Sequence, residues 1–405
     1  MTITEGTRIA FNPFEPGYFA DPSVQLNALR KQEAVHFMEF TGGYMVTGYD
    51  DAFRLLRDRS IGSTSENATS TPSIDAERAA AAQDPAGPNM LRVDGDDHTR
   101  MRRLVAQAFT PRAIEQWRVR AAELTEELLD VFEERGGGDA LHDFALPLPA
   151  TVISDMLGVP KADLETLRGW SHAMAKTLDA VNTEDEQRRS VDAAIAMDSY
   201  LREVYDAKVS EPADDIFSAL IAAEHDGDRL TKNEVISNIR LLYVAGHETT
   251  TNLIGNGLVE LFRHPDQLEM VRTSDEHDTN LVEEVLRFNS PVQMTRRIPD
   301  HDIEVSGTTI PAGSVILLCA VSANRDPRKF GPTADEFDIT RADAKDQLSF
   351  GGGAHFCLGA ALARLEGAIA IPRIIRRFPE LALAAEPEFE PRVVLRGVSR
   401  LDVTV

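Results

Sequence analysis

The sequence predicts a mainly α-helical protein with a few small β-sheets, folded as a single domain over residues 1–405. Apolar residues recur three or four positions apart from residue 97 to about 226, and glycine or proline interrupts the pattern at intervals. A second helical pattern covers 231–263 without a proline. Because 42% of the 405 residues are hydrophobic, the chain can bury a large core.

The N-terminal part is expected to be richer in β-structure than the helical core. Between the two, the polar, alanine-rich stretch 61–90 is interpreted as one long surface loop. The helix over 231–263 begins with a capping box, because Glu234 follows Thr231 by three residues, and it ends before Pro265. A helix of about 32 residues is about 48 Å long, so we expect it to cross the whole domain and to be largely buried.

Shorter elements are expected toward the C-terminus. Residues 280–288 have the pattern of a helix, and β-branched runs at 303–310 and 314–320 flank a turn at Pro311-Ala312-Gly313. A last long helix is expected to start after Cys357.

Composition excludes several classes of protein. Lys plus Arg number 42 against 66 Asp plus Glu, and the resulting charge of −24 argues against a nucleic-acid binder or a binder of anionic membranes. No apolar run approaches the ~20 residues that span a bilayer, and the N-terminus MTITEGTRIAFNPFEP lacks a signal-peptide pattern. We therefore expect a soluble, cytoplasmic protein. The two cysteines, Cys319 and Cys357, are too few for a disulfide framework.

Cys357 has an unusual position, between a glycine-rich segment and a helix start in SFGGGAHFCLGAALARLE, residues 349–366. Unpaired N–H groups at a helix N-terminus lower the pKa of a thiol and favour the thiolate, which is the form that binds metals. Phe350 is placed to shield the sulfur from water. These residues alone are also compatible with a buried structural cysteine or with a nucleophilic or redox cysteine.

The string FGGGAHFCLG resembles the haem-binding signature of the cytochrome P-450 family, with matches at Phe350, Gly353, His355, Cys357 and Gly359. The resemblance extends from GYDDAFRLLRD near the N-terminus to VVLRGVSRL near the C-terminus, and it is strongest to soluble bacterial members that modify macrolides and other polyketides. It implies the triangular helical fold of the family and a haem b whose iron binds the Cys357 thiolate, a ligand that favours O–O cleavage.

The central helix contains LLYVAGHETTTN, in which a glycine and three threonines interrupt good helix formers. Gly costs about 1 kcal/mol relative to Ala in a helix, and such violations often mark functional sites. Alternatively, these polar residues simply face solvent. AGHETT is similar to the acid-alcohol motif of the family, which implies that Ala245 and Gly246 line the haem. It also implies that Thr249 and Glu248 help deliver the protons that cleave the O–O bond.

Leu241, Leu242 and Val244 precede the acid-alcohol pair and are candidates for the substrate pocket, although they are equally ordinary core residues. Further candidates for substrate contact are Val292, Met294, Val393 and Val394.

Cations suited to haem propionates occur at family positions. His98 and Arg102 lie four apart on one helix face, and the resemblance adds Arg297 and His355, with Arg296 as a competitor for the role of Arg297. Taken one by one, each is equally compatible with surface charge.

Glu284 and Arg287 match the family's structural ExxR motif, although a surface ion pair is the usual meaning of this spacing. Where the family often places a third partner, this chain has Glu336, which leaves Arg325 or Arg341 as substitutes.

Electrons are expected from outside the chain, because it contains no flavin or nicotinamide domain. The resemblance implies a ferredoxin and its NAD(P)H-dependent reductase, and the basic residues between Arg100 and Arg120 would attract such an acidic donor. O2 and a mainly apolar, fairly bulky small molecule are the expected substrates. The alternatives are a peroxide-driven hydroxylase, a non-catalytic protein of the same fold, or a cysteine-nucleophile enzyme with His355 as base. The Glu248-Thr249 pair argues against the peroxide-driven hydroxylase, and the intact cysteine loop argues against the non-catalytic protein. The two-residue spacing between His355 and Cys357 argues against the cysteine-nucleophile enzyme.

Overall fold

The computed structural model describes residues 9–405 apart from residues 40, 180–181 and 226. Residues 1–8, which belong to the N-terminal segment that lacks a signal-peptide pattern, lie outside the described residues. Residue 226, the predicted end of the first helical region, also lies outside them. Within the described ranges, no helix has both the length and the apolarity needed to cross a membrane.

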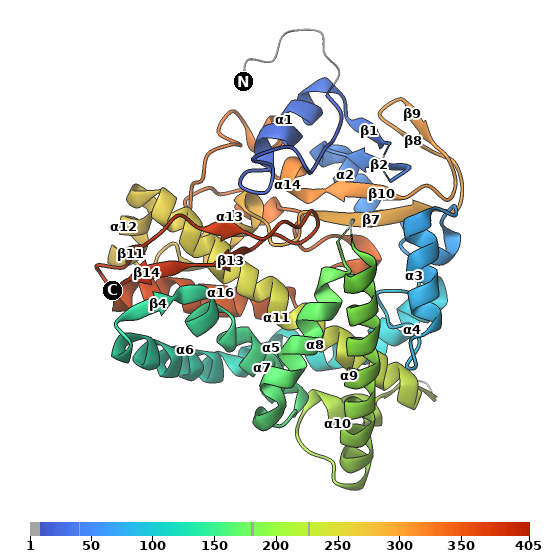
Figure 1. Cartoon of the computed structure of the whole chain (residues 1–405), viewed down its shortest axis with the longest axis horizontal. Coiled ribbons are helices and arrows are strands. Elements are labelled where there is room, and N and C mark those ends of the chain that lie inside the picture. Colours follow the sequence, from blue (N-terminus) through green and yellow to red (C-terminus); the bar gives the residue numbers. More distant parts are fainter. Residues whose placement is uncertain (1–8, 40, 180–181, 226) are drawn as a thin grey trace.

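Helices form most of the molecule, which confirms the predicted class (Figure 1). They surround a small mixed sheet and several two- or three-stranded pairs. The helices before the central one are α1 (Ser23–Gln32), α2 (Tyr49–Arg57), α3 (Pro72–Ala82), α4 (Gly95–Ala106), α5 (Pro111–Glu115), α6 (Trp117–Glu134), α7 (Pro147–Leu157), α8 (Leu164–Lys176), α9 (Glu184–Ser210) and α10 (Ile216–Ala222). Those from the central helix onward are α11 (Lys232–Arg263), α12 (Pro265–Thr273), α13 (Asp278–Phe288), α14 (Ala320–Ala323), α15 (Pro327–Phe330) and α16 (Ala360–Arg377). Short single-turn helices are η1 (Ser65–Asn67), η2 (Gln107–Phe109), η3 (Leu141–Ala145), η4 (Lys161–Asp163), η5 (Ala344–Asp346) and η6 (Gly353–His355).

A five-stranded sheet joins segments that are far apart in sequence. Its order is β1 (Val35–Met38), β2 (Gly43–Val46), β10 (Ile316–Cys319), β7 (Met294–Pro299) and β3 (Ile61–Gly62). Strand β10 runs parallel to β2 and antiparallel to β7. Helices α1, α2 and α14 lie around this sheet in Figure 1. The β-rich part therefore includes the N-terminal strands, as predicted, but is completed by strands from the later part of the chain.

The remaining strands form small pairs and one three-stranded sheet. The predicted β-runs at 303–310 and 314–320 are confirmed as a hairpin followed by β10. These strands are β4 (Gly137–Asp139), β5 (Glu224–His225), β6 (Asp228–Arg229), β8 (Ile303–Val305), β9 (Thr308–Ile310), β11 (Ala382–Leu383), β12 (Glu388–Phe389), β13 (Val398–Arg400) and β14 (Asp402–Thr404).

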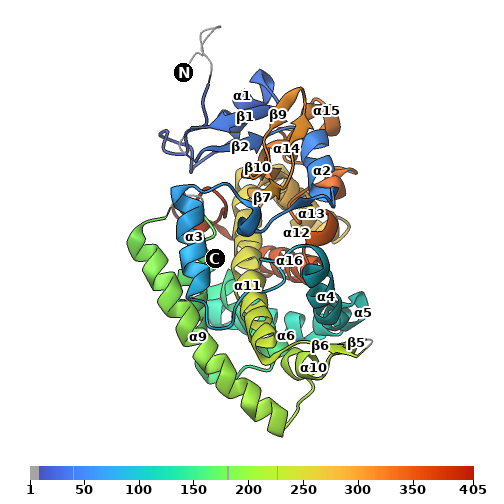
Figure 2. The ribbon, with the colours of Figure 1, turned by 90° about the vertical axis from the view of Figure 1, so that its right-hand side faces the viewer.

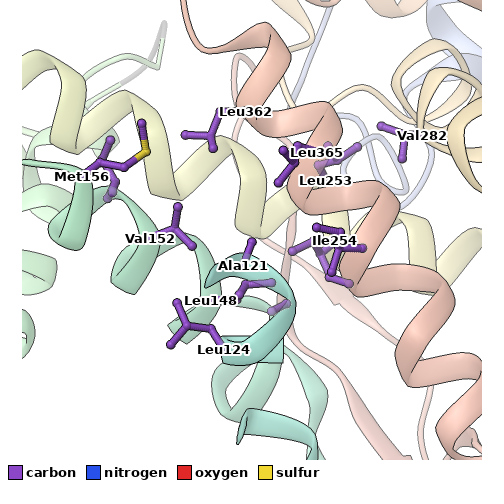
Figure 3. Packing of buried hydrophobic residues seen from close by; sticks show 14 of the residues in the cluster. Ala121, Leu124, Leu148, Val152, Met156, Leu253, Ile254, Val282, Leu362 and Leu365 are labelled. Carbon is purple, nitrogen blue, oxygen red and sulfur yellow. The ribbon is translucent and has the colours of Figure 1, made fainter. Parts of the chain in front are cut away.

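Helix α11 crosses the molecule, as its sequence predicted (Figure 2). Its capping box is formed, because the Thr231 hydroxyl accepts from the Glu234 N–H at 3.2 Å and the Glu234 carboxylate accepts from the Thr231 N–H at 2.8 Å. Most of its residues are buried against α7 and α16. Figure 3 shows this core, in which Leu253 and Ile254 of α11 lie between side chains of neighbouring helices.

The interpretation of 61–90 as one long surface loop is wrong. The segment contains β3, η1 and the eleven-residue helix α3. Thr71 caps α3 by accepting the Ile74 N–H at 3.3 Å, and proline occupies its first turn. Alanine is the strongest helix former, so the alanine-rich composition that was taken for a loop favours this helix.

Candidate functional site

The cysteine loop lies between η6 and α16 and packs against the end of α2. The Cys357 N–H donates to the Phe350 carbonyl at 2.9 Å, which closes the loop on itself. Gly353 has a φ of +65°, and a Cβ atom there would lie 2.5 Å from the Leu56 carbonyl oxygen. Only glycine combines that backbone conformation with so close an approach, so the glycine-rich sequence sets the position of the cysteine.

Burial raises the pKa of the Cys357 thiol, while the Gly359 N–H and the charges of Arg102 and Arg364 act in the opposite direction. The net shift is upward, which contradicts the expectation that a helix N-terminus lowers this pKa. The reason is that Cys357 precedes the first residue of α16 and is partly buried, so loss of hydration outweighs these contacts. Coordination to a metal deprotonates a thiol outright, so an iron bound at this position, rather than the local field, would produce the thiolate. Burial raises the pKa of the second cysteine, Cys319, to about 12, as expected for an inert core thiol.

Four cationic candidates meet at this loop, although they come from different elements. Arg102 of α4 donates to the Phe356 carbonyl. The rings of His98 and His355 lie 4.2 Å apart between centroids. Arg297 of β7 donates to the Gly352 carbonyl at 3.3 Å. The predicted set is thus brought together.

Arg296, the competitor, points elsewhere. It forms a two-point ion pair with Glu77 of α3 at 2.6 and 2.8 Å. Its charge is therefore already balanced, which leaves Arg297 as the arginine of this pair that faces the cysteine loop.

These residues fit a group that carries carboxylates. Arg297 is buried, and neither it nor Arg102 has a carboxylate ion-pair partner among the described residues. The His98 Nε2 atom is buried and lacks a hydrogen-bond partner within the same part of the chain. Unbalanced buried cations and unpaired polar atoms are costly, and the two propionates of a haem would satisfy them.

Asp94 orients His355 and was missed in the sequence. Its carboxylate accepts from the N–H groups of Ser63 and Thr64 at 2.7 and 2.8 Å, and it lies 2.9 Å from the His355 Nε2 atom. Burial raises the pKa of Asp94, but these hydrogen bonds outweigh burial and hold the pKa well below its usual range. Asp94 precedes α4 and resembles a helix cap in sequence, yet its side chain caps no amide of α4. Ser63 and Thr64, whose N–H groups it binds, are 31 and 30 positions away in the sequence, so no local signal identified Asp94.

In the α11 motif, one residue of the helix is exposed and two threonine hydroxyls bond to backbone carbonyls of the same helix. Ala245 is exposed although it lies in the middle of a largely buried helix. The Thr249 hydroxyl donates to the Ala245 carbonyl at 2.8 Å, and the Thr250 hydroxyl donates to the Gly246 carbonyl at 3.2 Å. Bonds of this kind compete with the backbone hydrogen bonds of a helix, although α11 continues through them as an α-helix. The missing Cβ of Gly246 faces Ile153 at 3.1 Å, so this glycine also permits close packing of α7 on α11.

Glu248 is largely buried and is surrounded by basic groups. His172 of α8 places its Nδ1 atom 3.1 Å from the carboxylate, and Arg392 and His247 each lie 3.9 Å away. Burial raises the pKa of Glu248, but the hydrogen bond from His172 and these charges outweigh burial, so the net shift is downward. Sequence analysis did not find His172 or Arg392, because neither lies near Glu248 in the chain.

The apolar pocket candidates divide into two groups. Leu242, Met294 and Val393 are buried within packed clusters, as core residues are. The others are partly exposed and remain candidates for substrate contact: Leu241, Val244, Val292 and Val394.

Glu284 and Arg287 form a fully buried ion pair with atoms 2.7 Å apart, not a surface pair. Arg341 lies 3.6 Å from the Glu284 carboxylate, so it is the third charged partner. The backbone carbonyl of Glu336, rather than its side chain, accepts from Arg287 at 2.8 Å. Arg325 instead stacks on the Phe288 ring at 3.6 Å.

The cysteine lies on a glycine-rich loop beside arginines that have no carboxylate partner in the described ranges, and the Glu248-Thr249 pair lies on the long helix that packs along α16. This arrangement fits a haem-thiolate oxygenase. Comparison with known proteins assigns the family. The cytochrome P450 family model matches residues 151–277 and 279–396, and the chain belongs to this family. Its members are monooxygenases that bind haem b through a cysteine thiolate.

The similarity to individual members covers nearly the full chain. Cytochrome P450 107B1 of Saccharopolyspora erythraea is 38% identical over 395 residues, or 95% of each chain. The polyketide biosynthesis cytochrome P450 PksS of Bacillus subtilis is 35% identical over 410 residues, covering 98% of this chain and 99% of the relative. The crystal structure of P450BioI in complex with a hexadec-9Z-enoic acid ligated acyl carrier protein has a TM-score of 0.89 and 34% identity, covering 96% of this chain and 100% of that one.

Proposed function

We propose that this cytochrome P450 inserts one oxygen atom of O2 into a mainly apolar, fairly bulky small molecule of the macrolide, polyketide, steroid or terpenoid type. The observation that carries the proposal is the open face of α11, where Ala245 is exposed beside Thr249 and Glu248. The partly exposed Leu241 and Val244 on the same helix make the adjoining surface apolar. The similarity to PksS, a polyketide biosynthesis enzyme, supports a bulky substrate.

The chain's own residues have distinct proposed roles. Cys357 would hold the haem iron, and His98, Arg102, Arg297 and His355 would bind the propionates. The bound haem supplies the redox chemistry that activates O2. Thr249 would donate a hydrogen bond toward oxygen in the pocket, and Glu248 would supply protons to it. Phe350 and Gly359 would shield and hydrogen-bond the sulfur.

Electrons would come from a ferredoxin and its NAD(P)H-dependent reductase, in a cytoplasmic setting like that expected for bacterial relatives. Arg103 and Arg112, both exposed, lie on helices α4 and α5 near the cysteine loop and form a docking patch together with Arg102. Such a patch would steer an acidic donor to the haem edge.

A carbon monoxide difference spectrum of the reduced protein tests the haem ligand. The expected result is a thiolate-type band in the parent protein that is lost in Cys357→His, together with turnover. Cys319→Ser is the matched control and should keep the band, because that thiol is buried in β10 away from the site. Full activity in Cys357→His would refute the assignment. Titration of the oxidised protein, without carbon monoxide, with candidate ligands then ranks substrate classes by their spin-state shift.

Thr249→Ala tests the acid-alcohol pair. We expect O2 and NAD(P)H use to continue while product falls and hydrogen peroxide appears, because protons no longer reach the oxygen in an ordered way. The measurement compares product formed with NAD(P)H consumed. Thr250→Ala, which removes the neighbouring hydroxyl, is the control. Matched NAD(P)H use and product formation in Thr249→Ala would show that the proposed proton delivery is wrong.

A further inference from the structure

Glu248 lies where α8 and α11 pack together (Figure 1). The His172 Nδ1 atom, on α8, is 3.1 Å from its Oε1 atom, and this is the one side-chain hydrogen bond of Glu248 among the described residues. The Glu248 side chain is 14% exposed and that of His172 is 46% exposed. His172 therefore stands between the buried carboxylate and bulk water.

The other basic groups around Glu248 are poor sources of protons. The His247 Nδ1 atom lies 3.1 Å from the Tyr243 carbonyl, and because a carbonyl only accepts, this nitrogen carries the ring's proton. Burial lowers the pKa of His247, so the ring is neutral and the Nε2 atom that faces Glu248 is a lone pair. Arg168 of α8, whose charge acts on His247, favours the same neutral form.

Arg392 cannot take the place of His172 either. Its guanidinium does not release a proton in the physiological range, and it is already paired with Glu390 at 2.7 Å. Its contribution to Glu248 is a fixed positive charge at 3.9 Å. Of the three groups, only His172 is an exposed imidazole, which can both pass a proton to Glu248 and take one from water.

We propose that His172 is a positioning residue for Glu248, which it holds on the α8 side as a carboxylate and reloads with protons. This inference rests on the proposed function, because it deepens the role of Glu248 in it. His172 connects the surface of α8 to the acid on α11, so proton supply to the pocket depends on α8 being packed against α11.

The proton balance of the step is simple. The imidazolium of His172 transfers its Nδ1 proton to the Glu248 Oε1 atom, which gives a neutral imidazole and a neutral carboxylic acid. The acid turns away from α8 and releases this proton toward Thr249. The exposed imidazole takes a proton from water, and the returning carboxylate restores the 3.1 Å contact.

Two variants of the haem-loaded protein separate hydrogen bonding from titration. His172→Gln keeps a donor toward Glu248 but does not titrate, and His172→Phe removes both. His301→Gln is the matched control, since His301 is also an exposed histidine 2.7 Å from a carboxylate but lies on the connection between β7 and β8. The measurements are kcat between about pH 5 and 8, the range in which histidine titrates, product formed per NAD(P)H, and the solvent hydrogen isotope effect.

We expect kcat of the parent to fall as pH rises through this range. In both His172 variants kcat should fall by about tenfold or more, lose this pH dependence and show a larger solvent isotope effect, because water must replace the histidine as donor. In a Glu248→Gln background, His172→Gln should have no further effect.

Infrared titration gives a readout independent of turnover. The C=O band of protonated Glu248 is identified by its absence in Glu248→Gln. It should persist to higher pH in His172→Phe than in the parent, because burial then raises the pKa of Glu248 without the opposing hydrogen bond.

Parent-like pH dependence, isotope effect and infrared titration in both variants would overturn the inference. A lower kcat with an unchanged pH profile would also overturn it, since that result indicates a purely structural role. If the parent protein itself shows no thiolate band or no turnover with any ligand class, the proposed function fails instead.

Discussion

At the scale of single residues, Glu366 is a buried carboxyl group that has no role in the proposed chemistry. It lies on α16, it is 1% exposed, and its Oε2 atom has no hydrogen-bond partner in the described part of the chain. Burial alone raises the pKa of its carboxyl to about 8. The folded protein therefore holds Glu366 as a neutral acid at neutral pH, whereas the unfolded chain ionises it near pH 4.

This difference predicts a pH-dependent stability. Between the two pKa values the folded state binds the extra proton, so the free energy of unfolding falls as pH rises, by on the order of 1 kcal/mol per pH unit. The contribution is complete below about pH 4 and is lost as pH passes about 8. Glu366→Gln should flatten this slope in urea unfolding, and the exposed Glu134→Gln should not. An unchanged slope in Glu366→Gln would mean that Glu366 is ionised in the folded state.

At the scale of elements, one buried arginine forms ion pairs that connect α11, α9 and the segment after α3, near the proposed pocket. Arg240 of α11 binds Asp198 of α9 at 2.7 Å and also pairs with Asp84, which follows α3. All three side chains are largely buried. Figure 2 shows α3 and α9 on the same side of α11. The network therefore holds the segment after α3 and the helix α9 against the central helix.

Breaking this network should loosen those segments. Arg240→Met leaves two buried carboxylates without their cation, which costs about 3–5 kcal/mol when a buried pair loses one member. We expect lower stability in urea unfolding and faster amide hydrogen exchange in residues 83–90 and 193–201. Arg118→Met, which removes the α6 arginine of an exposed ion pair, is the control. Equal exchange in Arg240→Met and the parent would show that other contacts hold these segments.

At the scale of the whole molecule, charge is distributed unevenly. The chain carries a net charge of −24, yet Arg102, Arg103 and Arg112 have no carboxylate ion pair among the described residues. The rest of the predicted basic cluster is neutralised, because Arg100 pairs with Glu234, Arg118 with Glu115, and Arg120 with Asp155. The predicted cluster of six arginines is thus reduced to three without a carboxylate partner in the part of the chain that the structure describes, of which Arg102 contacts the cysteine loop and Arg103 and Arg112 are exposed.

Charge removal at this patch should slow electron delivery. Arg112→Gln is expected to lower the association rate with an acidic [2Fe–2S] ferredoxin by a few-fold at low salt, with the difference shrinking as ionic strength rises. Arg118→Gln, whose parent charge is already paired, should have little effect. Stopped-flow reduction by ferredoxin measures both, and reduction by dithionite should not differ. Equal rates for the two variants would place the docking surface elsewhere.

Sequence patterns predicted local features well. Periodicity, capping and propensity within a few residues predicted the capped helix over 231–263, the helix at 280–288 and the β-runs after 303. The structure has each of them. The interpretation of 61–90 as a loop was wrong for a local reason as well. It gave the polarity of the segment more weight than the helix propensity of its alanines.

By itself, the sequence predicted the helical class and the long central helix, because these depend on residue types at short spacings. Its resemblance to the family predicted Cys357 as the iron ligand and Glu248-Thr249 as the acid-alcohol pair. Only the tertiary structure decided which side chains contact these residues. It selected Arg341 over Arg325 as partner of Glu284, and it placed Asp94 on His355 and His172 on Glu248. It also raised the pKa of Cys357 through burial. Contacts between distant segments, and the loss of solvent that accompanies them, are set by how the helices and strands pack, and no short stretch of sequence encodes that packing.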